Sequence, residues 1–188
     1  MGKENMNIDP LYWSWKDEIP HSVCDAIISE GLKNGVCQSK VGGNADNPVG
    51  SVNLEVRNSE VGFFSWNSWI GAICSHYMHQ ANNQAWNFQI TGQQDPQFTV
   101  YKNDQFYEFH QDQYSFEANM RKLSVVISIT DPDTYEGGEF EFFDGIKPEI
   151  KSRGSIMVFP SFLNHRVTPV ISGTRYSLVN WFVGEKFR

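Results

Sequence analysis

The chain has 188 residues, of which 40% are hydrophobic and 14% aromatic, so it can bury a substantial core and is not a disordered chain. This length predicts one domain that spans residues 1–188. A formal net charge of −7 argues against a nucleic-acid backbone as the main partner, although a local basic patch would be compatible with it. No apolar run is long enough to cross a membrane and the polar N-terminus lacks a signal-peptide core, so we expect a cytoplasmic protein.

The first part of the chain predicts two helices. One follows Pro20, which suits a first helical turn, and ends near Gly31 or Gly35. The other has apolar residues at helical spacing over residues 64–82. Between them, the Gly- and Asn-rich residues 42–50 predict a surface loop.

The second part of the chain predicts strands separated by Gly and Pro. The segments with strand-like patterns are residues 51–55, 85–90, 98–102, 123–130, 138–143, 155–159 and 176–183. Helices followed by many short strands favour an α+β fold, with a double-stranded β-helix (a cupin-like jelly roll) as its core and the N-terminal helices packed on one sheet. We expect helical support over roughly residues 15–82 and a barrel over roughly residues 85–184.

Three cysteines, Cys24, Cys37 and Cys74, are odd in number and widely spaced. A zinc site built from them would lack a CxxC pair. We therefore expect reduced thiols in an intracellular compartment.

The pattern with the clearest chemistry is His110-Gln111-Asp112 followed by His165 and Arg175. Side chains two residues apart on a strand share a face, so His110 and Asp112 can bind one metal. With His165 they would form two imidazoles and one carboxylate, which leave three positions open, as in non-haem Fe(II) oxygenases. Arg175 offers a planar fork for a carboxylate. HxD alone could equally be two solvated residues at a strand end.

Alternation places further side chains beside these. Ser177 and Trp181 share a strand face with Arg175. Tyr101 and the alternating residues of the 123–130 segment could line the same pocket, or the latter could simply fill the barrel interior; these residues are Ser124, Val126 and Ser128. Three nearby carboxylates could act in acid–base chemistry or form a solvated strand face: Glu136, Glu139 and Glu141.

Several blocks of the chain resemble the prolyl 4-hydroxylase group of Fe(II)/2-oxoglutarate dioxygenases, and PKHD-type hydroxylases in particular. The blocks are residues 101–112, 121–130, 135–139, 159–169 and 173–181. Residues 56–61 resemble, more weakly, the loop that covers the substrate in this family. Asp104 stands where the family often has Gly, so the geometry of that turn is open.

The resemblance implies roles for these residues. His110, Asp112 and His165 would bind Fe(II), and Arg175 would bind the distal carboxylate of 2-oxoglutarate. Fe(II), Arg175, Asp112 and the cosubstrate together would be neutral, as a dry pocket requires. The remaining cosubstrate-lining candidates are Tyr101, Ser177, Ser124 and Ser128, and the substrate candidates are Tyr107, Arg121, Trp181 and Arg57, the last on a lid. Tyr107 or Trp181 could instead be a simple core aromatic, and Arg57 could instead lie in a solvated loop.

The implied activity is hydroxylation of a prolyl residue in a peptide or protein, with conversion of 2-oxoglutarate and O2 to succinate and CO2 and with ascorbate as a supporting reductant. A lysyl residue or a free amino acid could be the substrate instead. A nucleic-acid demethylase of this fold would usually carry a second Arg where this chain has Trp181. A non-catalytic cupin-like binding module would need no such set of His, Asp and Arg residues.

Overall fold

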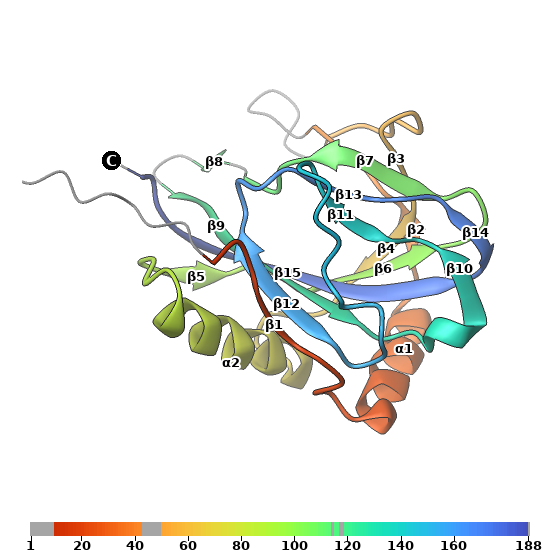
Figure 1. The fold of residues 1–188 in the computed structure, drawn as a ribbon, viewed down its shortest axis with the longest axis horizontal. Helices are drawn as coiled ribbons and strands as arrows, with labels where there is room; N and C mark the ends of the chain where they lie inside the picture. Colours follow the sequence, from red (N-terminus) through yellow and green to blue (C-terminus); the bar gives the residue numbers. More distant parts are fainter. Residues whose placement is uncertain (1–9, 43–49, 114, 117–118, 188) are drawn as a thin grey trace, which may run out of the picture.

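The structure is a computed structural model that describes residues 10–42, 50–113, 115–116 and 119–187 (Figure 1). The first half contains β1 (Trp13–Trp15), α1 (His21–Asn34), β2 (Cys37–Gln38), β3 (Arg57–Asn58), β4 (Glu60–Phe63), α2 (Trp69–Gln84) and β5 (Gly92–Gln93). The second half contains β6 (Gln97–Tyr101), β7 (Phe106–His110), β8 (Ser115–Phe116), β9 (Asn119–Ser128), a 3-10 turn (Pro132–Thr134), β10 (Tyr135–Gly137), β11 (Phe140–Phe142), β12 (Ile156–Pro160), β13 (His165–Val167), β14 (Val170–Gly173) and β15 (Arg175–Glu185).

The strands form two main antiparallel sheets. The major sheet has the order β1-β12-β9-β15-β6-β4-β2, with β5 beside β15 and β8 beside β9. The minor sheet has the order β11-β13-β7-β3, and β10 pairs separately with β14. Strands that alternate along the chain between two facing sheets define a double-stranded β-helix, so the predicted α+β jelly-roll class is confirmed.

Both helices lie on one face of the major sheet, away from the minor sheet (Figure 1). In β9 the alternate residues Leu123, Val125 and Ile127 are fully buried against the helices. The intervening Ser124 and Val126 therefore point toward the minor sheet. Alternation along one strand thus separates the apolar core from a partly polar interior between the sheets.

The helix boundaries follow from local chemistry. Pro20 directly precedes α1, and Gly35 ends it with a φ of 83°, as the sequence predicts. Helix α2 begins five residues later than predicted, at Trp69, because the Ser68 side chain accepts a hydrogen bond of 3.2 Å from the Gly71 amide and caps the helix there. In the described part of the chain, neither helix has the length and apolar character needed to cross a membrane.

Two predicted strands are wrong. Of residues 51–55, only Ser51 pairs, in an isolated bridge with Val41, and the segment then turns. Residues 85–90 are also not a strand, because the Asn82 side chain bonds both the amide and the carbonyl of Phe88 at 2.8 Å and closes a turn after α2. Their aromatic residues pack on the core without joining a sheet.

The helical support also contributes to the sheets, which the sequence did not predict. Strands β2 and β4 extend the major sheet, and β3 adds an edge to the minor sheet. The part of the predicted surface loop at residues 43–49 lies outside the described residues.

The packing of α1 on the sheet generates the first prediction. A Cβ at Gly31 would lie 2.7 Å from the ring of Phe98, which is fully buried and stacked on Tyr176. We expect Gly31→Ala to lower the free energy of unfolding by about 1–3 kcal/mol, because this overpacking outweighs the gain of at most about 1 kcal/mol in helix propensity. Urea denaturation measures the effect. Ser29→Ala, at an exposed position of the same helix, is the control and should be neutral; an unchanged midpoint for Gly31→Ala would contradict this packing.

Candidate metal and cosubstrate site

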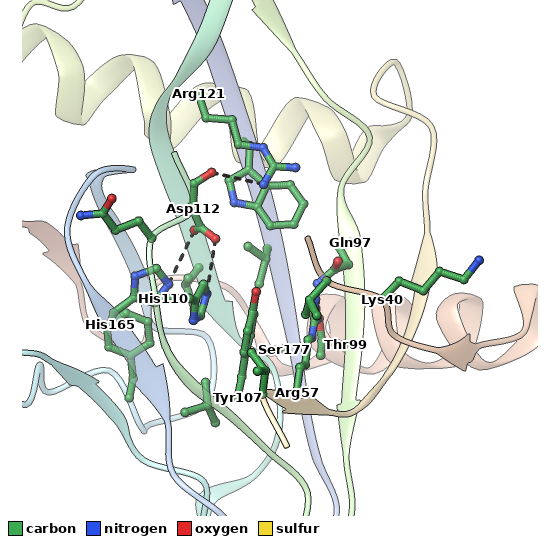
Figure 2. A pocket seen from close by; sticks show the side chains of 18 of the residues that line it. Lys40, Arg57, Gln97, Thr99, Tyr107, His110, Asp112, Arg121, His165 and Ser177 are labelled. Atoms are coloured by element: carbon green, nitrogen blue, oxygen red, sulfur yellow. Dashed lines mark hydrogen bonds and ion pairs between the residues drawn. The ribbon is translucent and has the colours of Figure 1, made fainter. Parts of the chain in front are cut away.

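Three side chains converge between the two sheets. His110 ends β7, His165 begins β13, and these two residues are direct partners in the ladder. Asp112 follows β7 and is 7% exposed; its Oδ1 lies 3.6 Å from His110 Nε2 and its Oδ2 lies 3.6 Å from His165 Nε2 (Figure 2). Among the described residues, this is the one group of His, Cys, Asp and Glu side chains close enough to share a metal, with all ligand atoms within 4.8 Å.

Hydrogen bonds fix the orientation of both imidazoles. His110 Nδ1 lies 2.8 Å from the carbonyl of Glu108, and His165 Nδ1 lies 2.9 Å from the carbonyl of Leu163. A carbonyl only accepts, so each Nδ1 carries the proton and donates. Each Nε2 then faces Asp112 and, in the neutral ring, offers its lone pair to a metal, which is the usual arrangement for a metal-binding histidine.

The carboxylate of Asp112 is held by the major sheet. Ser124 Oγ in β9 donates a 2.8 Å hydrogen bond to Asp112 Oδ2 and lies 2.9 Å from Ser161 Oγ. Arg121 Nη1 donates to the backbone carbonyl of Asp112 at 3.3 Å. Ser124, expected beside the cosubstrate, thus contacts a candidate metal ligand instead.

The charges of the triad suit a cation. Burial alone would raise the pKa of Asp112, but the imidazoles of His165 and His110 and the guanidinium of Arg121 hold it below its ordinary value. Burial lowers the pKa of His165 to about 4, although Asp112 opposes the shift. At neutral pH the group is therefore a carboxylate with a neutral His165, the protonation state that a metal ion needs.

Arg175 lines the same cavity, which has a volume of about 680 Å³. The residue is 4% exposed, and its guanidinium donates to Ser177 Oγ at 3.2 Å and lies 5.5 Å from the ring centre of Tyr101, the ladder partner of Arg175. No carboxylate among the described residues pairs with it. Gly138, with a φ of 60°, leaves it room, since a Cβ there would lie 2.8 Å from Arg175 Cδ. A buried, unpaired guanidinium is suited to an anionic ligand.

Tyr107 faces the cavity because of a β-bulge. His165 pairs with His110 and Val167 pairs with Tyr107, so β7 has one more residue than β13 over this stretch. Tyr107 lies three residues before His110, an odd offset on a strand, but the bulge brings it onto the face of the metal-ligand candidates. The ring centres of Tyr107 and His110 lie 3.4 Å apart. Burial raises the pKa of Tyr107 to about 12, so its hydroxyl remains a hydrogen-bond donor at neutral pH.

Two arginines border the cavity at opposite ends in Figure 2. Arg121 lies 3.8 Å over the Trp181 ring and donates from Nε to Gln94 Oε1 at 2.8 Å. Arg57 lies 4.5 Å over the Tyr107 ring and is 7% exposed. Arg57 belongs to β3 and not to a loop, so the predicted lid is wrong for this residue.

Other predicted residues fall outside the cavity. Ser128 is buried in β9 but does not line it. Glu141 is not solvated: it is 7% exposed and pairs with Lys147 at 2.5 Å and with Arg166 at 2.7 Å, whereas Glu136 is exposed. Asp104 adopts a φ of 64°, so the turn keeps a conformation that favours glycine.

Sequence reasoning missed three supporting residues. Phe140 stacks on His165 with ring centres 5.1 Å apart, Ser161 bonds Ser124, and Gln94 bonds Arg121. Strand alternation could have identified Phe140, but Ser161 and Gln94 lie outside strands and have no periodic signal. The cysteines are free thiols, and Cys24 and Cys74 are buried.

Comparison with known proteins agrees with this geometry. Residues 96–183, which carry the triad and Arg175, match the model of the 2OG-Fe(II) oxygenase superfamily. A PKHD-type hydroxylase of Hyphomonas neptunium is 41% identical over 68 residues, which are 35% of this chain and 30% of that protein. One from Shewanella sp. (strain ANA-3) is 35% identical over 92 residues, or 46% of this chain and 41% of that protein. The chain thus spans less than half the length of these curated relatives.

Solved structures share the fold over nearly the whole chain. The viral collagen prolyl hydroxylase of Paramecium bursaria Chlorella virus-1, with 2-oxoglutarate, has a TM-score of 0.69 at 20% identity and covers 94% of this chain and 97% of its own. A Pseudomonas putida prolyl-4-hydroxylase has a TM-score of 0.69 at 21% identity, with 92% of each chain covered. A Trichoplax adhaerens prolyl hydroxylase with a hypoxia inducible factor peptide has a TM-score of 0.72 at 16% identity, and the match covers 93% of this chain and 84% of that chain.

Residues 96–183 therefore resemble a 2OG-Fe(II) oxygenase domain, and the resemblance to prolyl 4-hydroxylase-like oxygenases is confirmed. This family implies Fe(II), 2-oxoglutarate and O2 as cofactors, as the sequence predicts. The described residues fit them: the oriented imidazoles and ionised Asp112 suit Fe(II), and Arg175 suits a carboxylate.

The bond from Ser124 to Asp112 predicts an effect on metal affinity. We expect Ser124→Ala to weaken Mn²⁺ binding about 10- to 100-fold, because the hydrogen bond from Ser124 orients the carboxylate of a metal ligand, and we expect Asp112→Ala to remove binding. Calorimetric titration measures both. Ser128→Ala, the same change on the same buried strand without a contact to Asp112, is the matched control. Equal affinities for the two serine variants would mean that the bond does not orient the carboxylate.

The lowered pKa of His165 predicts a pH dependence of stability. The unfolded chain takes up a proton near pH 6.5 and the folded metal-free chain only near pH 4, so stability is lost as the pH falls through this window. Between about pH 7.5 and about pH 5 the loss should be roughly 2 kcal/mol. His165→Asn should remove this dependence of the unfolding free energy on pH, and His79→Asn, at an exposed position, should keep it. A wild-type unfolding free energy that stays constant over this range would refute the assignment.

Proposed function

We propose that the chain is an Fe(II)- and 2-oxoglutarate-dependent dioxygenase that hydroxylates a prolyl residue in a peptide or protein. The observation that carries the proposal is that a buried arginine without a described acidic partner shares one cavity with the His110, Asp112 and His165 triad. When bound, Fe(II), 2-oxoglutarate and O2 would supply the oxidation, in which a substrate C–H becomes C–OH and 2-oxoglutarate becomes succinate and CO2.

The chain's own residues would bind and orient the cosubstrate. His110, Asp112 and His165 would hold the metal. Arg175 would bind the distal carboxylate through its two-nitrogen fork, and Ser177 would fix the orientation of that guanidinium. The cavity wall near Arg175 contains Tyr101, which packs with Val167, and these side chains would exclude water from the ion pair.

Tyr107 and Trp181 support the prolyl part of the proposal. Both rings lie on the cavity wall, Tyr107 against His110 and Trp181 beneath Arg121. The Tyr107 hydroxyl remains a donor and can bind a substrate carbonyl, while the flat rings suit an apolar pyrrolidine. The relatives named as prolyl hydroxylases agree with this substrate class.

The anchor role of Arg175 predicts a specific kinetic change. We expect Arg175→Ala to raise the Michaelis constant for 2-oxoglutarate about 10- to 100-fold, because a charge-assisted contact contributes about 1.5–3 kcal/mol. Arg175→Lys should recover only part of this, since an ammonium cannot form the fork. Metal affinity should remain near the wild-type value. Succinate formation at varied 2-oxoglutarate concentration measures the constant, and an unchanged value would place the anchor elsewhere.

Peptide hydroxylation tests the substrate. Mass spectrometry of proline-containing peptides after turnover should show a gain of one oxygen on proline. We expect Tyr107→Phe to impair this hydroxylation while leaving peptide-free turnover of 2-oxoglutarate near wild type, because it removes only a donor to the substrate. Trp181→Phe should impair peptide hydroxylation less than Tyr107→Phe does, because it keeps an aromatic ring in the cavity wall.

Tyr176→Phe makes the same change as Tyr107→Phe on the opposite face of the major sheet and should leave both activities unchanged. Equal losses of both activities in Tyr107→Phe would show that Tyr107 is structural. Modification of lysine or of free amino acids alone would replace the prolyl assignment.

A further inference from the structure

The cavity is basic although the chain is acidic. The formal net charge of the chain is −7. Among the described residues that line the cavity, the charged side chains are one carboxylate, Asp112, and four cations, Lys40, Arg57, Arg121 and Arg175. A basic cavity in an acidic protein indicates a binding site for anions, because the negatively charged remainder of the protein would repel an anion elsewhere.

Arg57 is one of three cavity cations that the proposed cosubstrate site does not use. Of the other two, Lys40 is exposed, and Arg121 donates hydrogen bonds to Gln94 and to the backbone carbonyl of Asp112. Arg57 Nε donates to Ser59 Oγ at 2.9 Å, and Ser59 Oγ donates to Ser39 Oγ at 3.0 Å, so the guanidinium is fixed in one orientation. It is 7% exposed, and no carboxylate in the described segments pairs with it. A buried charge without a counter-ion is costly, so its retention is best explained by an anion that binds there.

The charges of the metal, the cosubstrate, Asp112 and Arg175 balance one another, and this balance does not include Arg57. Fe(II) and doubly charged 2-oxoglutarate offset one another, and Asp112 offsets Arg175. Neither the metal nor the cosubstrate therefore neutralises Arg57. The remaining occupant of the cavity is the substrate, so the substrate should carry the missing negative charge.

The position of Arg57 locates that charge. Arg57 and Tyr107 are ladder partners, the guanidinium carbon lies 4.5 Å from the Tyr107 ring centre, and that ring lies 3.4 Å from the ring of His110. Figure 2 shows Arg57 and Tyr107 at the same end of the pocket. A side chain that reaches Arg57 would thus belong to a residue close to the one that lies over the triad.

We propose that Arg57 selects a polypeptide substrate with an Asp or Glu side chain next to the hydroxylated residue. The proposal rests on the polypeptide substrate of the proposed function. A carboxylate fits the fork of a single buried arginine, and Lys40 at the exposed rim adds attraction for further acidic residues. A nucleic acid is less suited, because its many phosphates would meet an acidic surface outside the cavity.

The test uses proline peptides that differ only in the flanking residues: Asp, its neutral isostere Asn, or Lys. Fluorescence anisotropy of labelled peptides measures binding to the Mn²⁺- and 2-oxoglutarate-loaded chain, and mass spectrometry measures hydroxylation by the Fe(II)-loaded chain. We expect the Asp peptide to bind and react at least about tenfold better than the Asn peptide, and the Lys peptide to be the poorest. High salt should reduce the preference.

Three variants assign the preference to Arg57. Arg57→Gln should remove it, and Arg57→Lys should keep part of it. Lys33→Gln, at an exposed position in the last turn of α1 on the other side of the major sheet, makes the same charge change and should keep all of it. Peptide-free turnover of 2-oxoglutarate shows that each variant is folded and loaded. The wild-type comparison of peptides stands even if an Arg57 variant does not fold.

The outcomes separate the two proposals. Equal hydroxylation of all three peptides would overturn the role of Arg57 and leave the proposed function intact. Persistence of the Asp preference in folded Arg57→Gln would also overturn it. Stronger binding of a single-stranded oligonucleotide than of the Asp peptide would overturn it as well. Turnover of 2-oxoglutarate without binding of any peptide would overturn both this inference and the polypeptide substrate.

Discussion

The site depends on the pairing of β7 with β13, because this ladder places His110 directly opposite His165. The two imidazoles come from strands far apart in the chain, and no local interaction could bring them together. Asp112 is then held between them by its position just past β7 and by Ser124 on the facing sheet. A shift of one residue in this register would turn one imidazole out of the cavity.

The surroundings of His165 make this arrangement rigid. Phe140 and Phe159 lie against its ring, with ring centres 5.1 Å and 4.9 Å away, so the imidazole is buried and cannot rotate freely. The same burial lowers its pKa and keeps it neutral. Next to His165, the ion pair of Glu141 with Arg166 joins β11 to β13, and Lys147, from a loop, pairs with the same carboxylate. Packing, protonation state and register thus support one another in presenting the triad.

The sequence predicted the parts of the fold that periodicity governs. Strand β9 alternates between residues that face the helices and residues that face the cavity, and such a strand is visible from its pattern alone. The spacing of His110 and Asp112 and the alternation of Arg175, Ser177 and Trp181 likewise predicted residues that the structure brings to one cavity.

What the sequence could not predict depends on partner strands. The bulge that turns Tyr107 toward the cavity exists only in the pairing of β7 with β13. Strand β3 has two residues, too few for a period, so Arg57 could not be placed in a sheet. Glu141 looked solvated because the residues that bury it, Arg166 and Lys147, are distant or in a loop. In each case, a long-range contact decided what the local pattern left open.

The most direct test of the account is whether the triad and Arg175 bind one molecule together. Calorimetry of 2-oxoglutarate binding, with and without Mn²⁺, measures this for the wild-type chain and for Asp112→Ala. We expect Mn²⁺ to strengthen binding at least about tenfold in the wild-type chain, because His110, Asp112 and His165 would hold a metal that binds one end of 2-oxoglutarate while Arg175 would bind the other, and we expect Asp112→Ala to abolish this gain. An affinity that is the same with and without Mn²⁺ in the wild-type chain would contradict it.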